Sequence, residues 1–287
     1  MIAVGRWAKA SMVILLGLFG ARDVYAWGDT GHQIICEIAF QELNPQARAR
    51  VIALLQRDPD FKLFSKACTW PDHPRKRASE HFVNLPRSAT HIGDDPCPVD
   101  DTCVVTAIDA DFAVLSQASA SEMDRLAALK YLGHWVGDVH QPLHVSFKDD
   151  RGGNAIDAQG PCAENLHAVW DTCIIERKLG SDIQHMASEL RARVTAAERV
   201  AWTSTRAKEW ANESLMITTA EAVRYCVKTE TGCWYEVDNE ALDLDEEKKV
   251  VTVDEAYMEA HLPTITQRLT QAGIRLGRLL NRALGGE

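Results

Sequence analysis

Apolar residues recur at helical spacing along most of the chain. Within residues 31–43 they fall every three to four positions, the period of an amphipathic helix, and Asn44-Pro45 ends the run. The same period predicts the other helices. For one of them, Ser121 is the predicted N-cap and Pro142 the residue that kinks or ends the helix. They cover residues 45–55, 109–116, 121–139, 165–179, 182–220 and 254–284, with breaks in the long segment 182–220.

Stretches rich in Asp, Pro, Gly and Cys separate these segments. They predict loops at residues 84–104, 148–162 and 228–248. Residues 237–253 are acidic and are interpreted as a short hairpin or an exposed loop. Because no repeat, low-complexity tract or linker divides the chain, the pattern predicts a single all-α domain, mostly helical, with short loops or a hairpin.

The first 26 residues follow a different pattern. Arg6 and Lys9 precede an apolar run at 12–19, and the segment ends in Val-Tyr-Ala at 24–26. This order is typical of a secretory signal peptide, and the apolar run is too short to cross a membrane. We expect cleavage after position 26, which leaves a domain of residues 27–287 that is secreted or periplasmic.

The charge balance limits the class of partner. The 287-residue chain has 41 acidic and 31 basic side chains and a formal net charge of −10. Such a protein repels polyanions at long range, which excludes one that coats duplex nucleic acid by charge alone, although bound metal ions would supply local positive charge. No apolar run after the leader approaches the ~20 residues of a membrane span, so we expect no stable membrane association. We also expect a monomer.

All eight cysteines follow the predicted cleavage point. An even number of cysteines in an exported chain favours disulfides over reactive thiols. Spacing indicates two small closed loops most strongly and two further pairs less strongly. The predicted pairs are, in that order, Cys97–Cys103 and Cys226–Cys233, then Cys36–Cys68 and Cys162–Cys173.

Two His-x3-Asp sequences are the first candidates for chemistry. His134 and Asp138 lie one turn apart in a predicted helix, as do His167 and Asp171, and His144 follows the first pair. Imidazole nitrogens and carboxylate oxygens together suit zinc. A single pair of this kind is more often a surface ion pair or a buried structural histidine. Two pairs and a third histidine in one exported chain favour a zinc site.

The residue exposed by cleavage adds another candidate ligand. Trp27 would carry a free α-amine five residues before His32. An α-amine has a pKa of about 7.7–8.0, low enough for a metal to displace its proton near neutral pH. Asp72 and His81 are further candidates, although each taken alone is equally a turn residue or a half-buried one. Residues 151–154, Arg-Gly-Gly-Asn, taken alone form a turn.

Together these motifs resemble those of the S1/P1 nuclease family, exported zinc enzymes that share a metal-site plan with the zinc phospholipases C. The matches run in order through residues 27–171. They are Trp27-Gly28-x-x-Gly31-His32, Trp70-x-Asp72, His81-Phe82, His134-x3-Asp138, Gly137-Asp138-x-x-Gln141-Pro142-Leu143-His144, Gly152-Gly153-Asn154 and His167-x-x-Trp170-Asp171. The helical remainder is compatible with the family fold.

The resemblance implies three zinc ions, held by histidine and carboxylate ligands that leave positions open for water and substrate. The implied ligands are Asp72, His81 and His134 for the first ion; Trp27, through its amino nitrogen and carbonyl oxygen, and His32 for the second; His144, His167 and Asp171 for the third; and Asp138 as a bridge between the first two.

The resemblance also implies an activity. It is the hydrolysis of phosphodiesters in single-stranded DNA and RNA, and of 3′-phosphorylated mononucleotides, to products that carry 5′-phosphates. Asp72 and Asp138 would be catalytic as ligands of the paired ions that activate water, and the third ion would stabilise the leaving 3′ oxygen. Single strands are favoured because bases in a duplex are already stacked.

Four residues are implied on the substrate side. Arg75 would contact the phosphate, although alone it is equally a solvated loop cation. Phe82 would stack on a nucleobase, although alone it is equally a core residue. Asn84 stands where the family has an acidic residue for base contact, so this departure leaves the base preference open. Asn154 is a candidate polar contact beside the phosphate or behind a ligand.

Two other functions fit the same ligands. A zinc phospholipase C would use the metal site on a lipid phosphodiester, whereas a non-catalytic zinc-binding protein would need neither Arg75 nor Phe82. Phe82 and the match at residues 165–171 favour the nuclease. The remaining histidines match no ligand position and are interpreted as structural or surface residues: His73, His91, His140, His185 and His261.

Overall fold

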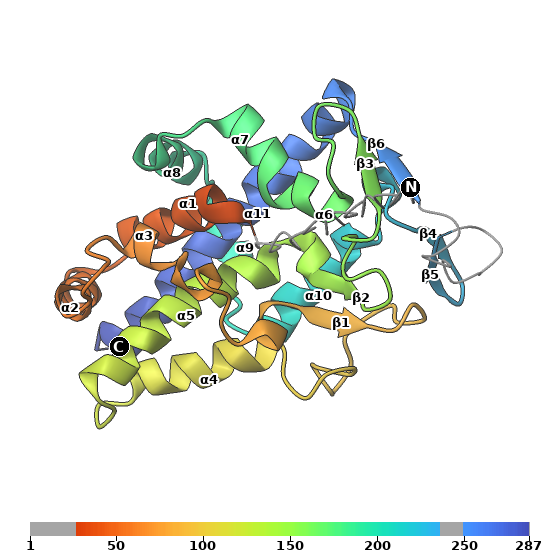
Figure 1. The fold of residues 1–287 in the computed structure, drawn as a ribbon. Helices are drawn as coiled ribbons and strands as arrows, with labels where there is room; N and C mark the ends of the chain where they lie inside the picture. The colour runs from red at the N-terminus through yellow and green to blue at the C-terminus, as the bar shows by residue number, and fades with distance from the viewer. Residues whose placement is uncertain (1–26, 236–248, 287) are drawn as a thin grey trace, which may run out of the picture.

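The computed structural model describes residues 27–235 and 249–286 (Figure 1). The predicted signal peptide lies outside the described residues, as do residues 236–248 and 287. Within the described ranges the chain is mostly helical, with three pairs of short strands. This confirms the predicted fold class.

Helices make up most of the described chain. The α-helices are α1 (Gly28–Gln41), α2 (Pro45–Gln56), α3 (Phe64–Ala67), α4 (Val104–Ser116), α5 (Glu122–His140), α6 (Leu166–Ala168), α7 (Ile174–Leu179), α8 (Ile183–Ala192), α9 (Ala196–Ala201), α10 (Ala207–Thr218) and α11 (Glu255–Leu284). Shorter segments are the 3-10 turns η1 (Trp70–Asp72), η2 (Ala78–His81), η3 (Pro142–His144) and η5 (Glu221–Val223), and the π-helical η4 (Val169–Cys173). None of these described helices is both long and apolar enough to span a membrane.

The predicted helices are present, with shifted ends. Ser121 caps α5 by accepting a hydrogen bond from the backbone N–H of Asp124 at 3.1 Å, and α5 stops before Pro142, as predicted. Helix α4 begins five residues before the predicted start, because Cys103 occupies its N-cap position. The segment 182–220 contains three separate helices, α8 to α10.

Helices α1, α5 and α11 form the centre of the domain. Helix α11 packs against α1 and α5, and α4 lies along α5 (Figure 1). Trp27, Trp135, Trp170 and Trp210 are fully buried around this centre. Each Å² of buried apolar surface stabilises the fold by roughly 25 cal/mol. This packing therefore fixes α1 and α5 in place, and with them the polar side chains that these helices carry inside the domain.

Short strands connect segments that are far apart in the chain. Two pairs are parallel and one is an antiparallel hairpin: β1 (Val83–Leu85) with β2 (Val145–Phe147), β3 (Asp157–Gln159) with β6 (Val250–Thr252), and β4 (Val227–Thr229) with β5 (Gly232–Trp234). Val83 pairs with Val145 in a parallel register, so the residues just before the two strands come together. Those residues include His81 and His144.

The acidic segment 237–253 differs from its prediction. Its described end forms β6, which pairs in parallel with β3, a strand inside the predicted loop 148–162. Val250 and Thr252 are exposed while Val251 is buried. A strand with one buried residue gives too weak an apolar pattern to be recognised from the sequence.

All four predicted disulfides are present, and they use every cysteine of the chain. Cys36–Cys68 joins α1 to the turn that precedes Asp72. A Cβ atom on Gly133 would lie 2.5 Å from the Cys68 sulfur, so this disulfide packs directly against α5. Four disulfides are typical of proteins that fold in an oxidising compartment.

Candidate metal centre

Histidine and aspartate side chains from seven segments converge beside the centre of the domain. Among the described residues, three groups bring their ligand atoms within 4.8 Å of one another. The groups are Asp72–His81–His134, His32–His134–Asp138 and His144–His167–Asp171, and every member is buried. These are the eight side chains named from the sequence as ligands.

The first group lies between η1, η2 and α5. His81 Nδ1 is 3.2 Å from His134 Nε2 and 3.5 Å from an Asp72 carboxylate oxygen. Asp72 also lies 3.6 Å from His134 Nε2. Ligand atoms of three side chains, each from a different segment, therefore face one small space.

The second group shares His134 with the first. His32, on α1, lies 3.3 Å from one Asp138 oxygen, and its ring stacks on His134 with 3.9 Å between centroids. The other Asp138 oxygen lies 3.1 Å from His81 Nδ1. Asp138 thus faces both groups, as the proposed bridging role requires.

Trp27 lies next to the second group. Its indole N–H donates to the Gly137 carbonyl at 2.8 Å, one residue before Asp138, and the side chain is fully buried. Its own carbonyl accepts from Gly31 N–H at 3.0 Å in the first turn of α1. The indole therefore anchors the first residue of the predicted mature chain against α5.

The third group lies where η3 meets α6 and η4. His167 Nε2 is 3.1 Å from His144 Nε2 and 3.1 Å from an Asp171 oxygen. The side-chain amide of Gln141 donates to the other Asp171 oxygen. Gln141 was not among the residues named from the sequence as site residues, although it belongs to the motif that ends in His144.

Backbone carbonyls fix the proton on four of these imidazoles. His81 donates from Nε2 to Lys76, and His134, His144 and His167 donate from Nδ1 to Cys68, His81 and Gly152 respectively, at 2.6–2.9 Å. A carbonyl can only accept, so the opposite nitrogen of each neutral ring carries a lone pair. These second nitrogens point into the three groups.

Two of the inward nitrogens, those of His134 and His144, carry no proton at pH 7. Burial lowers the pKa of His134 well below its ordinary value and lowers that of His144 to about 4, so both rings are neutral at pH 7. Burial alone would lower the pKa of His167, but the Asp171 carboxylate raises it above its ordinary value, so Nε2 of this ring can hold a proton toward Asp171 until a metal displaces it. A cation placed among them would satisfy the lone pairs, which makes this donor set fit zinc.

Several carboxylate oxygens likewise lack a hydrogen-bond donor. Among the described residues, both Asp138 oxygens and both His32 ring nitrogens are buried without a hydrogen-bond partner, as is one oxygen of Asp72 and of Asp171. Burial, and after it the Asp138 charge, raises the pKa of Asp72 to about 9. Burial alone would raise the pKa of Asp138, but the neighbouring histidines, His134 foremost, hold it well below its ordinary value.

The raised pKa of Asp72 predicts a pH dependence of metal binding. In the metal-free protein Asp72 keeps its proton below about pH 9, so zinc must displace that proton and its affinity should rise with pH up to that point. Titration calorimetry at pH 7 in two buffers of different ionisation enthalpy counts the protons released. We expect zinc binding to Asp72→Asn to release one proton fewer than zinc binding to the wild type. An unchanged number of released protons would contradict the assignment of Asp72 as a ligand.

Two glycines make room for the ligands. A Cβ atom on Gly137 would lie 2.7 Å from His32 Nδ1. Gly152 has a φ of 68°, and a Cβ there would lie 2.6 Å from the Leu143 carbonyl. The positive φ and the lack of room for a Cβ together favour glycine at this position, where the Gly152 carbonyl accepts from His167.

We therefore expect Gly137→Ala to displace His32. Zinc affinity at the second group should fall by about 10–100-fold, as it does when a ligand loses its orienting neighbour, while the third group keeps its zinc. Zinc content of the purified variant and its affinity by competition with a chelator measure this. Gly93→Ala is the matched control, because nothing lies within 4 Å of a Cβ at that exposed position. Wild-type affinity in Gly137→Ala would refute the steric argument.

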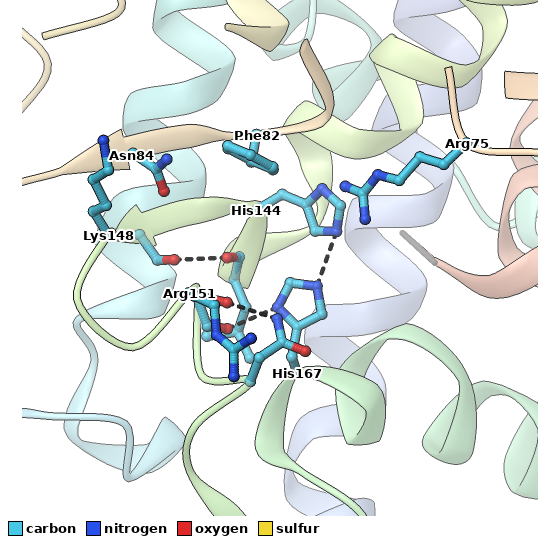
Figure 2. A pocket seen from close by; sticks show the side chains of 11 residues that line it. Arg75, Phe82, Asn84, His144, Lys148, Arg151 and His167 are labelled. Atoms are coloured by element: carbon cyan, nitrogen blue, oxygen red, sulfur yellow. Dashed lines mark hydrogen bonds between the residues drawn. The ribbon is translucent and has the colours of Figure 1, made fainter. Parts of the chain in front are cut away.

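A pocket of about 420 Å³ opens beside the third group (Figure 2). Its lining residues come from η3, from the turn at 151–154 and from the loop and strand around Phe82: Arg75, Phe82, Asn84, Leu143, His144, Ser146, Lys148, Arg151, Gly152, Asn154 and His167. The Arg75 guanidinium lies 5.9 Å from the centre of the Phe82 ring. All four substrate-side residues named from the sequence thus lie at one pocket, the size of a small-ligand site.

The two asparagines of this pocket are already partly engaged. Asn84 donates its amide N–H to Asp100 at 2.6 Å, and Asn154 donates to the Arg151 carbonyl at 2.6 Å. Asp100 lies inside the loop closed by Cys97–Cys103 and also accepts from Lys148 at 3.1 Å. No sequence signal marked Asp100, because its partners lie 16 and 48 residues away.

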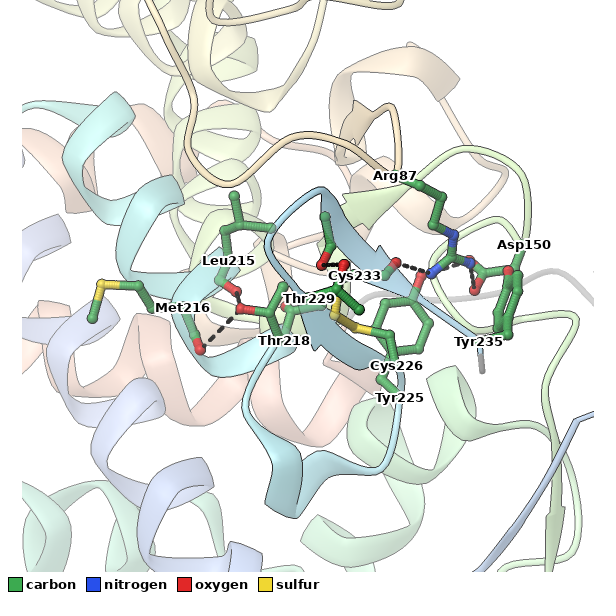
Figure 3. The surroundings of a disulfide bond; sticks show 12 residues. Arg87, Asp150, Leu215, Met216, Thr218, Tyr225, Cys226, Thr229, Cys233 and Tyr235 are labelled. Atoms are coloured by element: carbon green, nitrogen blue, oxygen red, sulfur yellow. Dashed lines mark hydrogen bonds and ion pairs between the residues drawn. A yellow bond between two sulfur atoms is a disulfide. The ribbon is translucent and has the colours of Figure 1, made fainter. Parts of the chain in front are cut away.

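A buried ion pair supports the turn that carries Gly152. Asp150 is fully buried and accepts from Arg87, from the Tyr225 hydroxyl and from Gly153 N–H at 2.6, 2.6 and 3.0 Å (Figure 3). Arg87 also stacks on Tyr235, 3.7 Å from the ring centre. These supporting residues were not recognised from the sequence, since each looks like an ordinary charged or aromatic residue until the fold brings them together.

The remaining histidines belong to no described group of candidate ligands. His140 is fully buried, donates to the Val136 carbonyl at 2.8 Å and lies 2.9 Å from Arg275. His261 is also buried and bonds to a backbone carbonyl, whereas His91 and His185 are exposed. His73 pairs with Asp29 at 2.8 Å near the surface.

Comparison with known proteins gives the family. The model of the S1/P1 nuclease family matches residues 27–285. Endonuclease 2 of Arabidopsis thaliana is 31% identical over 292 residues, which cover 93% of this chain and 94% of the relative. Nuclease S1 of Aspergillus oryzae and nuclease P1 of Penicillium citrinum are 26% and 25% identical, and each comparison covers 91% of this chain and more than nine-tenths of the relative.

The chain belongs to the S1/P1 nuclease family, which confirms the resemblance inferred from its motifs. It is therefore a nuclease.

Proposed function

We propose that this protein is an exported, zinc-dependent endonuclease and 3′-nucleotidase. It hydrolyses phosphodiesters of single-stranded DNA and RNA, and 3′-phosphorylated mononucleotides, to products with 5′-phosphates. The observation that carries the proposal is the set of inward-facing imidazole nitrogens and carboxylates, whose third group opens through His144 and His167 onto a pocket of about 420 Å³. A cluster of cations would give these buried lone pairs their partners.

The proposed centre holds three zinc ions. Their ligands are Asp72, His81 and His134; His32 with the amino nitrogen and carbonyl oxygen of Trp27; His144, His167 and Asp171; and Asp138 between the first two. Zinc held there would supply the positive charge that activates water and stabilises the phosphate and the leaving 3′ oxygen. The backbone hydrogen bonds support this assignment, because they already orient four of the imidazoles with the second ring nitrogen toward the groups.

The residues of the pocket position the substrate. Arg75 donates to the phosphate oxygens, where its planar guanidinium neutralises charge. Phe82 stacks on the base, which contributes about 1–3 kcal/mol and tolerates every base. The Asn84 amide N–H is held by Asp100, so its carbonyl oxygen remains as the acceptor for a base edge. Asn154 has a buried carbonyl oxygen without a partner among the described residues, which makes it a polar contact for the sugar or phosphate.

Export follows from the same set of residues. Cleavage after position 26 would free the Trp27 amine beside the second group, so processing and metal binding are linked. The four disulfides suit the periplasm or the exterior of the cell.

The test measures metal content and substrate range on the same protein. Mature protein that begins at Trp27 is analysed for zinc per chain and assayed on single-stranded DNA, RNA and phosphatidylcholine, with and without a chelator. We expect close to three zinc ions and chelator-sensitive cleavage of both single strands. Hydrolysis of the lipid alone would make the protein a phospholipase C. Bound zinc without hydrolysis would make it a zinc-binding protein.

A further inference from the structure

The pocket beside the third group carries an excess of positive charge that the proposed function does not yet use. Three of its eleven lining residues are cations, Arg75, Lys148 and Arg151, and none of these described lining residues is Asp or Glu. The chain as a whole is acidic, with ten more acidic than basic side chains. Asp100, which pairs with Lys148 at the edge of the pocket, offsets one of these charges and leaves two positive charges in excess. This local reversal of charge marks the pocket as a site for an anion with more than one negative group.

The cations occupy different parts of the pocket. Figure 2 shows Arg75 and Lys148 at opposite sides, with Phe82 and His144 between them. Arg75 lies close to the Phe82 ring and is assigned to the scissile phosphate. Lys148 and Arg151 lie in the segment that follows β2, on the side of the pocket away from Arg75.

Both outer cations are held in place by the backbone or by a neighbour. Lys148 bonds to Asp100 at 3.1 Å, and the second Asp100 oxygen holds Asn84, so the ammonium group stays at the rim of the pocket. Arg151 has a φ of 55°, a conformation that arginine rarely adopts, because it begins the turn that presents Gly152 to His167. No described residue forms an ion pair with the Arg151 guanidinium, so its charge is available.

The direction of the substrate follows from the third group. On the proposed function, the leaving 3′ oxygen lies at His144, His167 and Asp171, two of which line the pocket. The nucleoside that carries this oxygen therefore fills the pocket, with its base on Phe82. Its 5′ carbon then points away from the scissile phosphate, toward the wall that carries Lys148 and Arg151.

We propose that Lys148 and Arg151 form a second phosphate subsite, which binds the 5′-phosphate of the nucleoside on the 5′ side of the cleaved bond. This inference rests on the proposed function. It makes linkages inside a strand, and ends with a 5′-phosphate, better substrates than an unphosphorylated 5′-terminal linkage. The subsite selects the position of cleavage through charge and leaves base selection to Phe82 and Asn84.

The test uses two dinucleotides that differ only in this phosphate. The zinc-loaded protein is titrated in a calorimeter with d(ApA) and d(pApA) whose internal linkage is an uncharged, non-hydrolysed methylphosphonate. We expect about fivefold to tenfold tighter binding of d(pApA), from two partly exposed charge contacts. The difference should shrink as salt rises, since exposed charges are screened.

Variants assign the effect to these residues. Lys148→Gln/Arg151→Gln should bring the ratio of the two affinities below about twofold, because the ratio isolates the effect of the 5′-phosphate. Arg50→Gln/Lys228→Gln removes two exposed cations outside the pocket and is the matched control. Equal affinities in the wild type, or an unchanged ratio in the pocket variant, would overturn the inference. The two dinucleotides report binding without cleavage, so their result is separate from the proposed function. Failure of the wild-type protein to hydrolyse single strands would instead refute that function.

Discussion

Asp138→Asn should abolish hydrolysis of single-stranded DNA, with a loss on the order of 10³-fold or more in kcat/KM, the range seen when a residue central to the reaction is removed. Asp138 lies 3.3 Å from His32, 3.1 Å from His81 and 3.4 Å from His134, so it serves two of the three groups. An amide keeps the shape of the side chain but loses the negative charge that two cations would share. We expect zinc content to fall from about three ions per chain to about one.

A second buried carboxylate provides the control. Asp58 is as deeply buried as Asp138 and accepts from Lys130 at 2.7 Å, but it belongs to no described group of candidate ligands. Asp58→Asn should lower the thermal midpoint without changing zinc content or kcat. If Asp138→Asn lowered only the thermal midpoint and kept both zinc and activity, Asp138 would be a structural residue and the bridging assignment would be wrong.

A single extra residue in front of Trp27 should also be severely damaging. The extension turns the α-amine into an amide, which cannot give a lone pair to a metal near neutral pH. We expect the loss of one zinc ion per chain and a fall in activity of about 100-fold. Mature protein and protein with one added alanine are compared by zinc analysis and by initial rates on single-stranded DNA.

The packing of Trp27 makes this test specific. Its indole is fully buried and bonded to Gly137, so the same side chain stays in place when the extension is added. Equal thermal midpoints for the two proteins would show that the fold is intact. Full zinc content and full activity in the extended protein would exclude the Trp27 amine as a ligand.

Helical periodicity was enough to predict much of this centre. It placed His134 with Asp138, and His167 with Asp171, one turn apart, and each pair does meet in the structure at 3.4 and 3.1 Å. The second pair does so although residues 169–173 form a π-helical turn instead of a regular helix. Cysteine spacing gave the disulfides because three of the four loops are short.

The remaining features depend on contacts between distant segments. His81 and His144 meet because two three-residue strands pair in parallel, and strands this short leave no alternating pattern in the sequence. The carbonyl groups that orient the imidazoles are backbone atoms, which every residue has. No residue type in the sequence therefore indicates them. Asp100 reaches Asn84 only through the loop closed by a disulfide.

The support of the Gly152 turn has a consequence for how the chain matures. Asp150 holds that turn through Arg87, from the first third of the chain, and through Tyr225, from the last third. Arg87 also donates to the carbonyl of Cys233, inside the β4–β5 hairpin. A chain that folds as it is made therefore cannot complete the support of this turn until residues near 225–233 have been synthesised. The orientation of His167, which depends on the Gly152 carbonyl, is therefore fixed late in folding.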